Sequence, residues 1–364
     1  MMITLRNVGG FILLLIYTCL FGELFLRFLA PQPIVPRYVT GTKWGIRGNI
    51  PGAQYVQITP ETTAHISVNN QGFRSDHEYV IEKPARLCRI GFFGDSYFMG
   101  YEVNSQDMFV TQVQNMLAEK GFHVEVLNFA VSGFGTAEEV IALQKYGLTY
   151  EPDLIVFEWH QSDIEDNIRS ALFKLNQTSK LEQWHETYLP AVDINDRLQN
   201  IAAYQWLSDH SQFFNAVKEK TTVMIKQALA KYNRLRYHSA ENPNANDKEF
   251  DQHEAQSLSV ALLKYANEIS QAHNIPFLIF DIPIFSSRTD FVSSAVNLAL
   301  PPELNERLVS PLKKFQSIAN PETQLYFEKG HRHFTPKGNQ VAASVLVERI
   351  LNSENASFAG CKEK

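Results

Sequence analysis

Short apolar runs alternate with helical patterns from residue 86 onward, and this alternation constrains the fold most strongly. Strands are predicted over 87–93, 124–128, 154–158, 276–283 and 323–327. Helices are predicted between and after them over 105–120, 136–146, 251–273, about 302–318, and from Thr335-Pro336 onward. Strands that alternate with helices form a parallel sheet covered on both faces. We therefore expect a flavodoxin-like, three-layer α/β/α domain with a parallel central sheet over 86–352.

The remaining segments have a different composition. Residues 168–250 are polar and helical in pattern, which predicts a helical insertion into this domain. Residues 31–85 are predicted to form an extended linker and a short-strand extension, because PQPIVP (31–36) indicates an extended linker and residues 38–85 are rich in Gly, Pro, Thr and Asn. Residues 353–364 are expected to form a C-terminal tail.

The N-terminus contains a long apolar segment. Residues 10–22 carry no charge, and Glu23 and Arg27 are the only charged residues up to residue 30. A bilayer-spanning helix needs about 20 such residues, so 1–30 is predicted to be an N-terminal transmembrane helix. A cleaved signal peptide and a buried helix are the alternatives, although no small-x-small cleavage site promptly follows the apolar core. The flanking charges do not decide the orientation.

Composition excludes some functions. The net charge is −6 and the basic residues are scattered, so no nucleic-acid partner is expected. Cys19 lies in the apolar segment, which leaves Cys88 and Cys361 for at most one disulfide that the sequence does not require.

Polar or glycine-bearing loops follow the ends of four predicted strands. They contain Gly94-Asp95-Ser96, residues 128–135, residues 160–167 and residues 331–339. Active sites of open α/β sheets lie beyond the carboxyl ends of the strands. A serine nucleophile needs a neighbouring base, and His333 can act as one for Ser96. The pair His331 and His333, with Glu328 as a third ligand, is an alternative metal site, but no metal or cofactor is expected.

These loops, in order, resemble the sequence blocks of the SGNH (GDSL-like) hydrolases. GDSYFMG (94–100), NFAVSGFGT (128–136) and HFTPKGN (333–339) carry the resemblance, and VNNQGFRSDHEY (68–79) is similar to the lead-in of membrane-anchored bacterial members associated with polysaccharide modification. The resemblance implies that Ser96 is the nucleophile and His333 the general base. It also implies an oxyanion hole formed by Ser96, Gly133 and Ser162, with Asp95, Asp163, His331 and Glu328 as supporting residues.

The chain departs from the family's pattern at two positions. Ser162 stands directly before Asp163, where the family has an asparagine that donates to the oxyanion. The family's orienting acid precedes the histidine by two or three residues, and here those positions are His331 and Gly330. Glu328 or a backbone carbonyl is the expected substitute. Loss of a single oxyanion donor typically costs about 10²–10³ in rate, so weak activity is a further expectation.

The resemblance implies a serine esterase that removes acyl groups, in particular O-acetyl groups, from a carbohydrate through an acyl-enzyme. An O-acyltransferase with the same site is the first alternative. The second is a glycan-binding or scaffold subunit of an envelope polysaccharide system, and a soluble lipase or thioesterase is disfavoured by the apparent anchor. The chain is expected to be a single-pass membrane protein whose catalytic domain lies in the periplasm or otherwise outside the cytoplasm.

Overall fold

The computed structural model describes residues 5–239, 247–287, 290–329, 331–352, 358 and 361–362. Its centre is a five-stranded sheet in the order β13-β10-β7-β5-β6. All neighbouring strands in this sheet are parallel. The strands are β5 (Cys88–Phe93), β6 (Val124–Asn128), β7 (Leu154–Trp159), β10 (Phe277–Asp281) and β13 (Leu308–Val309). The predicted α/β class with a parallel central sheet is confirmed.

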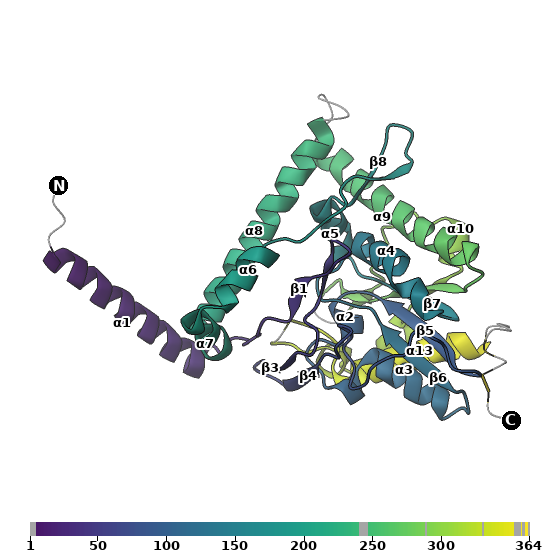
Figure 1. Ribbon diagram of the computed structural model, residues 1–364, viewed down its shortest axis with the longest axis horizontal. Coiled ribbons are helices and arrows are strands. Elements are labelled where there is room, and N and C mark those ends of the chain that lie inside the picture. Colours follow the sequence, from purple (N-terminus) through teal and green to yellow (C-terminus); the bar gives the residue numbers. More distant parts are fainter. Residues whose placement is uncertain are drawn as a thin grey trace.

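Helices cover both faces of this sheet (Figure 1). On one face lie α3 (Phe109–Ala118) and α13 (Pro336–Asn352), which pack against each other. On the other lie α4 (Thr136–Lys145), α5 (Ser162–Ser170) and α9 (Asp247–Ala272). The central strands β5 and β7 are buried along their whole length, as expected of apolar strands with a helix layer on each side.

The region after β10 differs from the prediction. The expected helix over 302–318 is α10 (Pro302–Asn305), the edge strand β13 and α11 (Leu312–Gln316). The expected strand over 323–327 is also wrong, because α12 (Pro321–Leu325) occupies most of it and Tyr326 makes only an isolated bridge to Phe334. Proline explains the breaks, because Pro311 caps α11 and Pro321 begins α12.

The segment before the sheet packs onto the domain as two small antiparallel sheets. One pairs β1 (Val39–Gly41) with β2 (Arg47–Asn49), and the other pairs β3 (Gln54–Ile58) with β4 (Thr63–Ser67). At the other end of the chain, a disulfide between Cys361 and Cys88 links the C-terminal tail to the first residue of β5. Residues 353–357, 359–360 and 363–364 of the predicted tail lie outside the described residues.

The segment between β7 and β10 contains a short hairpin and several helices. The hairpin is β8 (Phe173–Leu175) with β9 (Leu181–Gln183). The helices that follow are α6 (Val192–Gln199), α7 (Ala202–His210) and α8 (Gln212–Ser239), which leads toward α9. Figure 1 shows α8 as one long helix on the outside of these layers, where it packs against α5.

The N-terminal helix α1 (Leu5–Leu29) extends away from the domain (Figure 1). Its 21 residues Gly9–Leu29 contain a stretch with a mean hydropathy of 2.0, and none of this stretch is buried. It is therefore long and apolar enough to cross a membrane. Its C-terminal part contacts α8.

Candidate active site

Ser96 lies in a sharp turn between β5 and the short helix α2 (Ser96–Met99). The turn requires Gly94, because a Cβ at that position would lie 2.3 Å from Glu158 Oε2. The Asp95 side chain caps α2 by accepting a 3.0 Å hydrogen bond from the Tyr97 N–H. Glu158 Oε2 accepts bonds from the N–H groups of Asp95 and Phe98. The serine is thus placed at the carboxyl end of the sheet on a backbone that is held on both sides.

His333 connects this serine to a carboxylate. Ser96 Oγ lies 2.7 Å from His333 Nε2, and His333 Nδ1 lies 3.1 Å from Glu102 Oε2. A carboxylate can only accept, so Nδ1 carries the proton and Nε2 is free to accept from the serine hydroxyl. Asp95 Oδ1 is a second acceptor for that hydroxyl at 3.3 Å, but the imidazole is closer. These side chains have the arrangement of an Asp/Glu-His-Ser catalytic triad.

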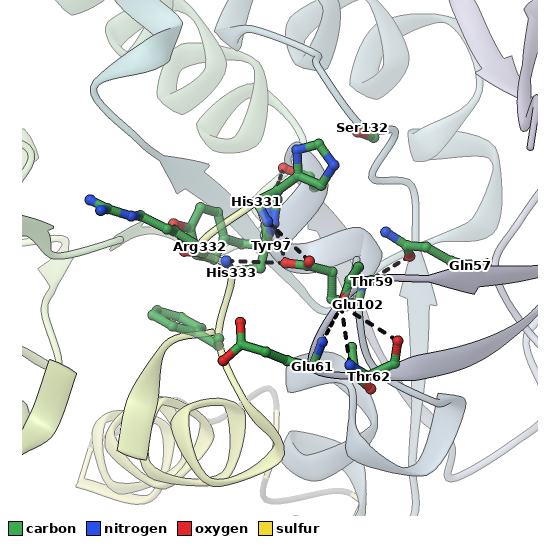
Figure 2. Close-up of polar contacts among 12 residues, drawn as sticks. Gln57, Thr59, Glu61, Thr62, Tyr97, Glu102, Ser132, His331, Arg332 and His333 are labelled. Carbon is green, nitrogen blue, oxygen red and sulfur yellow. Dashed lines mark hydrogen bonds and ion pairs between the residues drawn. The ribbon is translucent and has the colours of Figure 1, made fainter. Parts of the chain in front are cut away.

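Glu102 is the carboxylate that contacts the imidazole, and the sequence analysis did not identify it. It lies six positions after Ser96, on the loop that follows α2, rather than just before the histidine. Its oxygens also accept from the N–H groups of His331, at 3.0 Å, and His333, at 3.4 Å (Figure 2). Burial raises the pKa of Glu102, but the hydrogen bond from His333 and the other donors more than offset this and hold the pKa below its ordinary value. Glu102 is therefore ionised at neutral pH.

Glu328 does not take that place. Its side chain is exposed, and the carboxylate at the imidazole is that of Glu102. The expectation that Glu328 or a backbone carbonyl orients the imidazole is therefore wrong, because Glu102 makes this contact.

The loop that carries Glu102 is held by residues from the segment before the sheet. The guanidinium of Arg74 donates to the carbonyl of Met99, at 2.9 Å, and to those of Gly100 and Val103. Burial lowers the pKa of Arg74 to about 10, so it remains charged at neutral pH. Gln57 accepts from the Glu102 N–H at 3.1 Å. Glu102 has a φ of +67°, a conformation that a non-glycine residue adopts only where neighbours enforce it.

Gly133 lies beyond β6, as the resemblance implies, with a φ of +81° that favours glycine. Its carbonyl accepts from Arg47, which also pairs with the buried Glu138. Within the part of the chain that the structure describes, no hydrogen bond uses the N–H of Ser96 or of Gly133. Both groups are thus available as donors to a bound oxyanion.

The third loop brings His160 rather than Ser162 toward the site. The Ser162 hydroxyl lies 2.7 Å from His160 Nδ1, and the Ser162 N–H also donates to that nitrogen. Since a backbone N–H can only donate, Nδ1 is unprotonated and the proton sits on Nε2. Burial lowers the pKa of His160, so the ring is neutral at neutral pH. Its ring lies 5.3 Å from that of Tyr97, which in turn lies 4.8 Å from His333.

Several carboxyl groups are buried behind this site. Burial and the charge of Asp95 raise the pKa of Glu158 well above its ordinary value. Burial and nearby carboxylates do the same for Asp163, which accepts from Thr136 Oγ1 at 3.3 Å. The pKa of Asp95 itself is lowered, because the Glu158 hydrogen bond and His160 outweigh its burial. Asp95 is thus the ionised member of the group and the others are protonated.

The alternative metal site has no matching geometry. Among the residues described, no group of three or more His, Cys, Asp or Glu side chains is arranged to hold a metal ion. The rings of His331 and His333 lie 6.3 Å apart. His331 Nδ1 lies 3.9 Å from Glu219 of α8, so His331 lines the side of the site that faces this helix.

No protein-family model matches this chain, and no curated protein matches it significantly. Three similar solved structures illustrate its neighbours. A lipase/acylhydrolase from Enterococcus faecalis is 17% identical, covers 72% of this chain and 95% of its own, and has a TM-score of 0.30. A psychrotrophic esterase from Pseudoalteromonas is 14% identical, with 73% and 99% coverage and a TM-score of 0.36. A lipolytic protein of the G-D-S-L family from Veillonella parvula is 12% identical, with 73% and 100% coverage and a TM-score of 0.30.

Proposed function

We propose that this chain is a membrane-anchored serine esterase in which Ser96 is the nucleophile. The observation that carries the proposal is the continuous contact from Ser96 Oγ through His333 to Glu102. Ser96 Oγ attacks the acyl carbonyl and its proton passes to His333 Nε2. The imidazolium then protonates the leaving alcohol, and water hydrolyses the acyl-enzyme by the reverse sequence. Glu102 fixes the tautomer of His333 and stabilises the imidazolium.

The oxyanion of the tetrahedral intermediate has three candidate donors. Two are the N–H groups of Ser96 and Gly133, which have no other partner among the described residues. The third is His160 Nε2–H, with Ser162 holding the tautomer that makes this nitrogen a donor. This modifies the expectation that the Ser162 hydroxyl itself donates. A neutral imidazole is a suitable electrophile, because it polarises a carbonyl oxygen without losing its proton.

The substrate that we propose is an acetyl ester on a carbohydrate. This finer proposal rests on the resemblance of residues 68–79 to anchored bacterial members that accompany polysaccharide modification. In the structure the same segment supplies Arg74, which holds the loop of the acid. This segment thus has a structural contact to the site, whereas the carbohydrate substrate rests on the resemblance alone.

We propose that the catalytic domain lies outside the cytoplasm. The disulfide between Cys88 and Cys361 supports this, because disulfides persist in oxidising compartments and are rare in the cytosol. With α1 across the membrane, the N-terminus is then cytoplasmic. A cysteine accessibility assay on intact cells, with the label placed in the domain, tests this orientation.

The test of the activity is acetate release from an aryl acetate and from an acetylated oligosaccharide. The full chain in detergent is compared with Ser96→Ala. Loss of release in the variant supports the esterase, and equal release by both proteins contradicts it. Acetyl transfer to an added oligosaccharide, in place of acetate release, would instead identify the acyltransferase. Oligosaccharide binding by both proteins without turnover of any ester would indicate the glycan-binding role.

A further inference from the structure

One face of α8 carries an exposed apolar stripe. Val217, Met224 and Ile225 are 50%, 69% and 58% exposed. Met224 and Ile225 follow Val217 by seven and eight positions, so the three side chains share one side of the helix. The opposite side packs against the domain, since Asn233 lies there and donates to the carbonyl of Arg169 in α5 at 2.8 Å. The stripe thus belongs to an amphipathic helix whose apolar face is not covered by the protein.

The stripe faces the side of α8 on which α1 lies. Phe213 contacts α1, because a Cβ built on Gly22 would lie 2.6 Å from the Phe213 ring. Val217 follows Phe213 by four positions and Met224 by eleven, about one and three helical turns. Figure 1 shows α1 and α8 meeting at the C-terminal end of α1 and diverging from there. The stripe thus points into the angle between the two helices.

Polar contacts fix this junction. Glu23 of α1 accepts from the Ser211 hydroxyl, at 2.7 Å, and from the Phe213 N–H, at 2.9 Å, and so caps the start of α8. Arg27 donates to the carbonyl of His210 at 2.6 Å. Glu23 and Arg27 are the first charged residues after the uncharged stretch 10–22, so they mark the level where α1 reaches the lipid headgroups. α8 therefore starts at the membrane surface.

The charge of α8 complements an anionic surface. The sequence of this helix contains six basic residues and one acidic residue, Glu219. Basic residues with an apolar face are typical of helices that lie in the interface of a membrane with anionic lipids. Trp206 on the preceding helix α7 is 60% exposed, and tryptophan is enriched at the same depth.

We infer that α8 is an interfacial helix that lies along an anionic bilayer, with Val217, Met224 and Ile225 between the lipid headgroups. The single acidic residue of α8, Glu219, faces the opposite way, toward His331 of the catalytic site. The site is then held about one helix diameter, roughly 10 Å, from the membrane surface. Esters carried on molecules at the bilayer surface would reach it directly.

The inference is tested by nitroxide accessibility on the full chain in nanodiscs of phosphatidylethanolamine and phosphatidylglycerol. A Cys19→Ser background keeps the Cys88–Cys361 disulfide and removes the other thiol. Labels are placed at Met224→Cys, at Leu15→Cys in α1 as the buried-in-lipid control, and at Glu119→Cys on α3's exposed end as the water control. Circular dichroism and thermal unfolding establish that each labelled protein is folded.

The expected result is that the Met224 label is more accessible to oxygen and less accessible to a water-soluble nickel complex than the Glu119 label. Equal accessibility at Met224 and Glu119, with Leu15 deep in lipid, would overturn the inference while leaving the anchor in place. Protection at Met224 that appears only with two copies of the chain in one nanodisc would also overturn it in favour of a dimer. Replacing phosphatidylglycerol with phosphatidylcholine should reduce the protection, and no change would contradict the role of anionic lipid.

Discussion

The two segments that form the proposed catalytic site are held in place in different ways. The segment from Gly94 to Val103 is buried except for the half-buried Ser96 and Tyr97, and its backbone is held by Glu158 and Arg74. The histidine segment is flanked by the exposed residues Glu328 and Lys329, and Arg332 has a φ of +60°. Its described contacts to the site include the Tyr97 hydroxyl, which donates to the Arg332 carbonyl at 3.2 Å (Figure 2).

The difference shows how a carboxylate far from the histidine in the sequence can still orient the histidine ring. Glu102 accepts from two backbone N–H groups of the histidine segment as well as from the ring of His333. The segment Gly94–Val103 thus carries both the proposed nucleophile and the proposed acid, and this acid contacts the segment that carries the proposed base. A carboxylate placed before the histidine could orient the ring but would not tie the two segments together.

Among the changes to the two segments, Ser96→Ala should have the largest effect on activity. Of the contacts between the two segments it removes the 2.7 Å hydrogen bond between Ser96 Oγ and His333 Nε2, and it leaves those of Glu102 in place, so the fold should be unchanged. Turnover of an aryl acetate should fall on the order of 10⁴- to 10⁶-fold, as for other serine nucleophiles. Steady-state rates and thermal unfolding of the same preparations measure both quantities. A folded variant with more than a tenth of the original rate would show that Ser96 is not the nucleophile.

Glu102→Gln should lower kcat on the order of 10³- to 10⁴-fold, because an amide cannot stabilise the imidazolium. The two backbone N–H groups donate to different oxygens of Glu102, and the single amide oxygen can keep only one of these bonds, so the free energy of unfolding should fall by about 1–3 kcal/mol. Glu328→Gln is the matched control and should leave kcat unchanged. The opposite ranking of these two variants would place the acid before the histidine, as in the family's pattern.

Arg74→Met tests whether the position of the segment Gly94–Val103 depends on the hydrogen bonds from Arg74. The variant leaves the carbonyls of Met99, Gly100 and Val103 without this donor, and displacement of Glu102 should lower kcat up to about 10²-fold with little change in KM. The unmet hydrogen bonds should also lower the free energy of unfolding by about 1–3 kcal/mol. Arg74→Lys should recover part of kcat. A loss of stability with kcat unchanged would limit Arg74 to a structural role.

Removal of the disulfide should affect stability but not catalysis. Cys88 is the first residue of β5, and the site lies beyond the other end of that strand. Cys88→Ser with Cys361→Ser should lower the free energy of unfolding by about 2–5 kcal/mol, measured by denaturant titration. The rate at a temperature where both proteins are folded should be equal. A large fall in that rate would show that the tail influences the site.

The smallest effect concerns pH. The folded-state pKa of Glu102 lies below its ordinary value of 4.5, so its ionised form stabilises the fold above that value. This contribution is lost as the pH falls through the lowered folded-state pKa. Glu102→Gln should therefore flatten the acid limb of a plot of unfolding free energy against pH. An identical limb in both proteins would indicate that Glu102 is not held as a buried, hydrogen-bonded carboxylate.

The sequence was informative where a single pattern decided the local structure. The strand over 124–128 is β6, because an apolar run bounded by Gly121 and a polar loop has few alternatives. The strand over 323–327 failed, since a short apolar run also fits the buried end of a helix such as α12. Periodicity does not separate these two cases.

The acid was beyond the reach of sequence reasoning for a different reason. Glu102 contacts His333 across 231 positions of the chain, and only the path of the loop after α2 brings it there. Glu102 is the first acidic residue after Ser96, and this is the one sequence feature that pointed to it. Its burial and its positive φ are visible only in the fold. The proposal that His160 takes the place of Ser162 as oxyanion donor could not come from the sequence either, because it depends on a side-chain contact.

The central claim is that Ser96 is activated by His333 and Glu102, and covalent labelling tests it most directly. The full chain is treated with a fluorophosphonate, a reagent that forms a stable ester with an activated serine, and the labelled peptide is identified by mass spectrometry. We predict labelling on Ser96 in the natural sequence, greatly slowed labelling in Glu102→Gln and none in Ser96→Ala. Labelling on another serine, or an equal labelling rate in Glu102→Gln, would contradict the account.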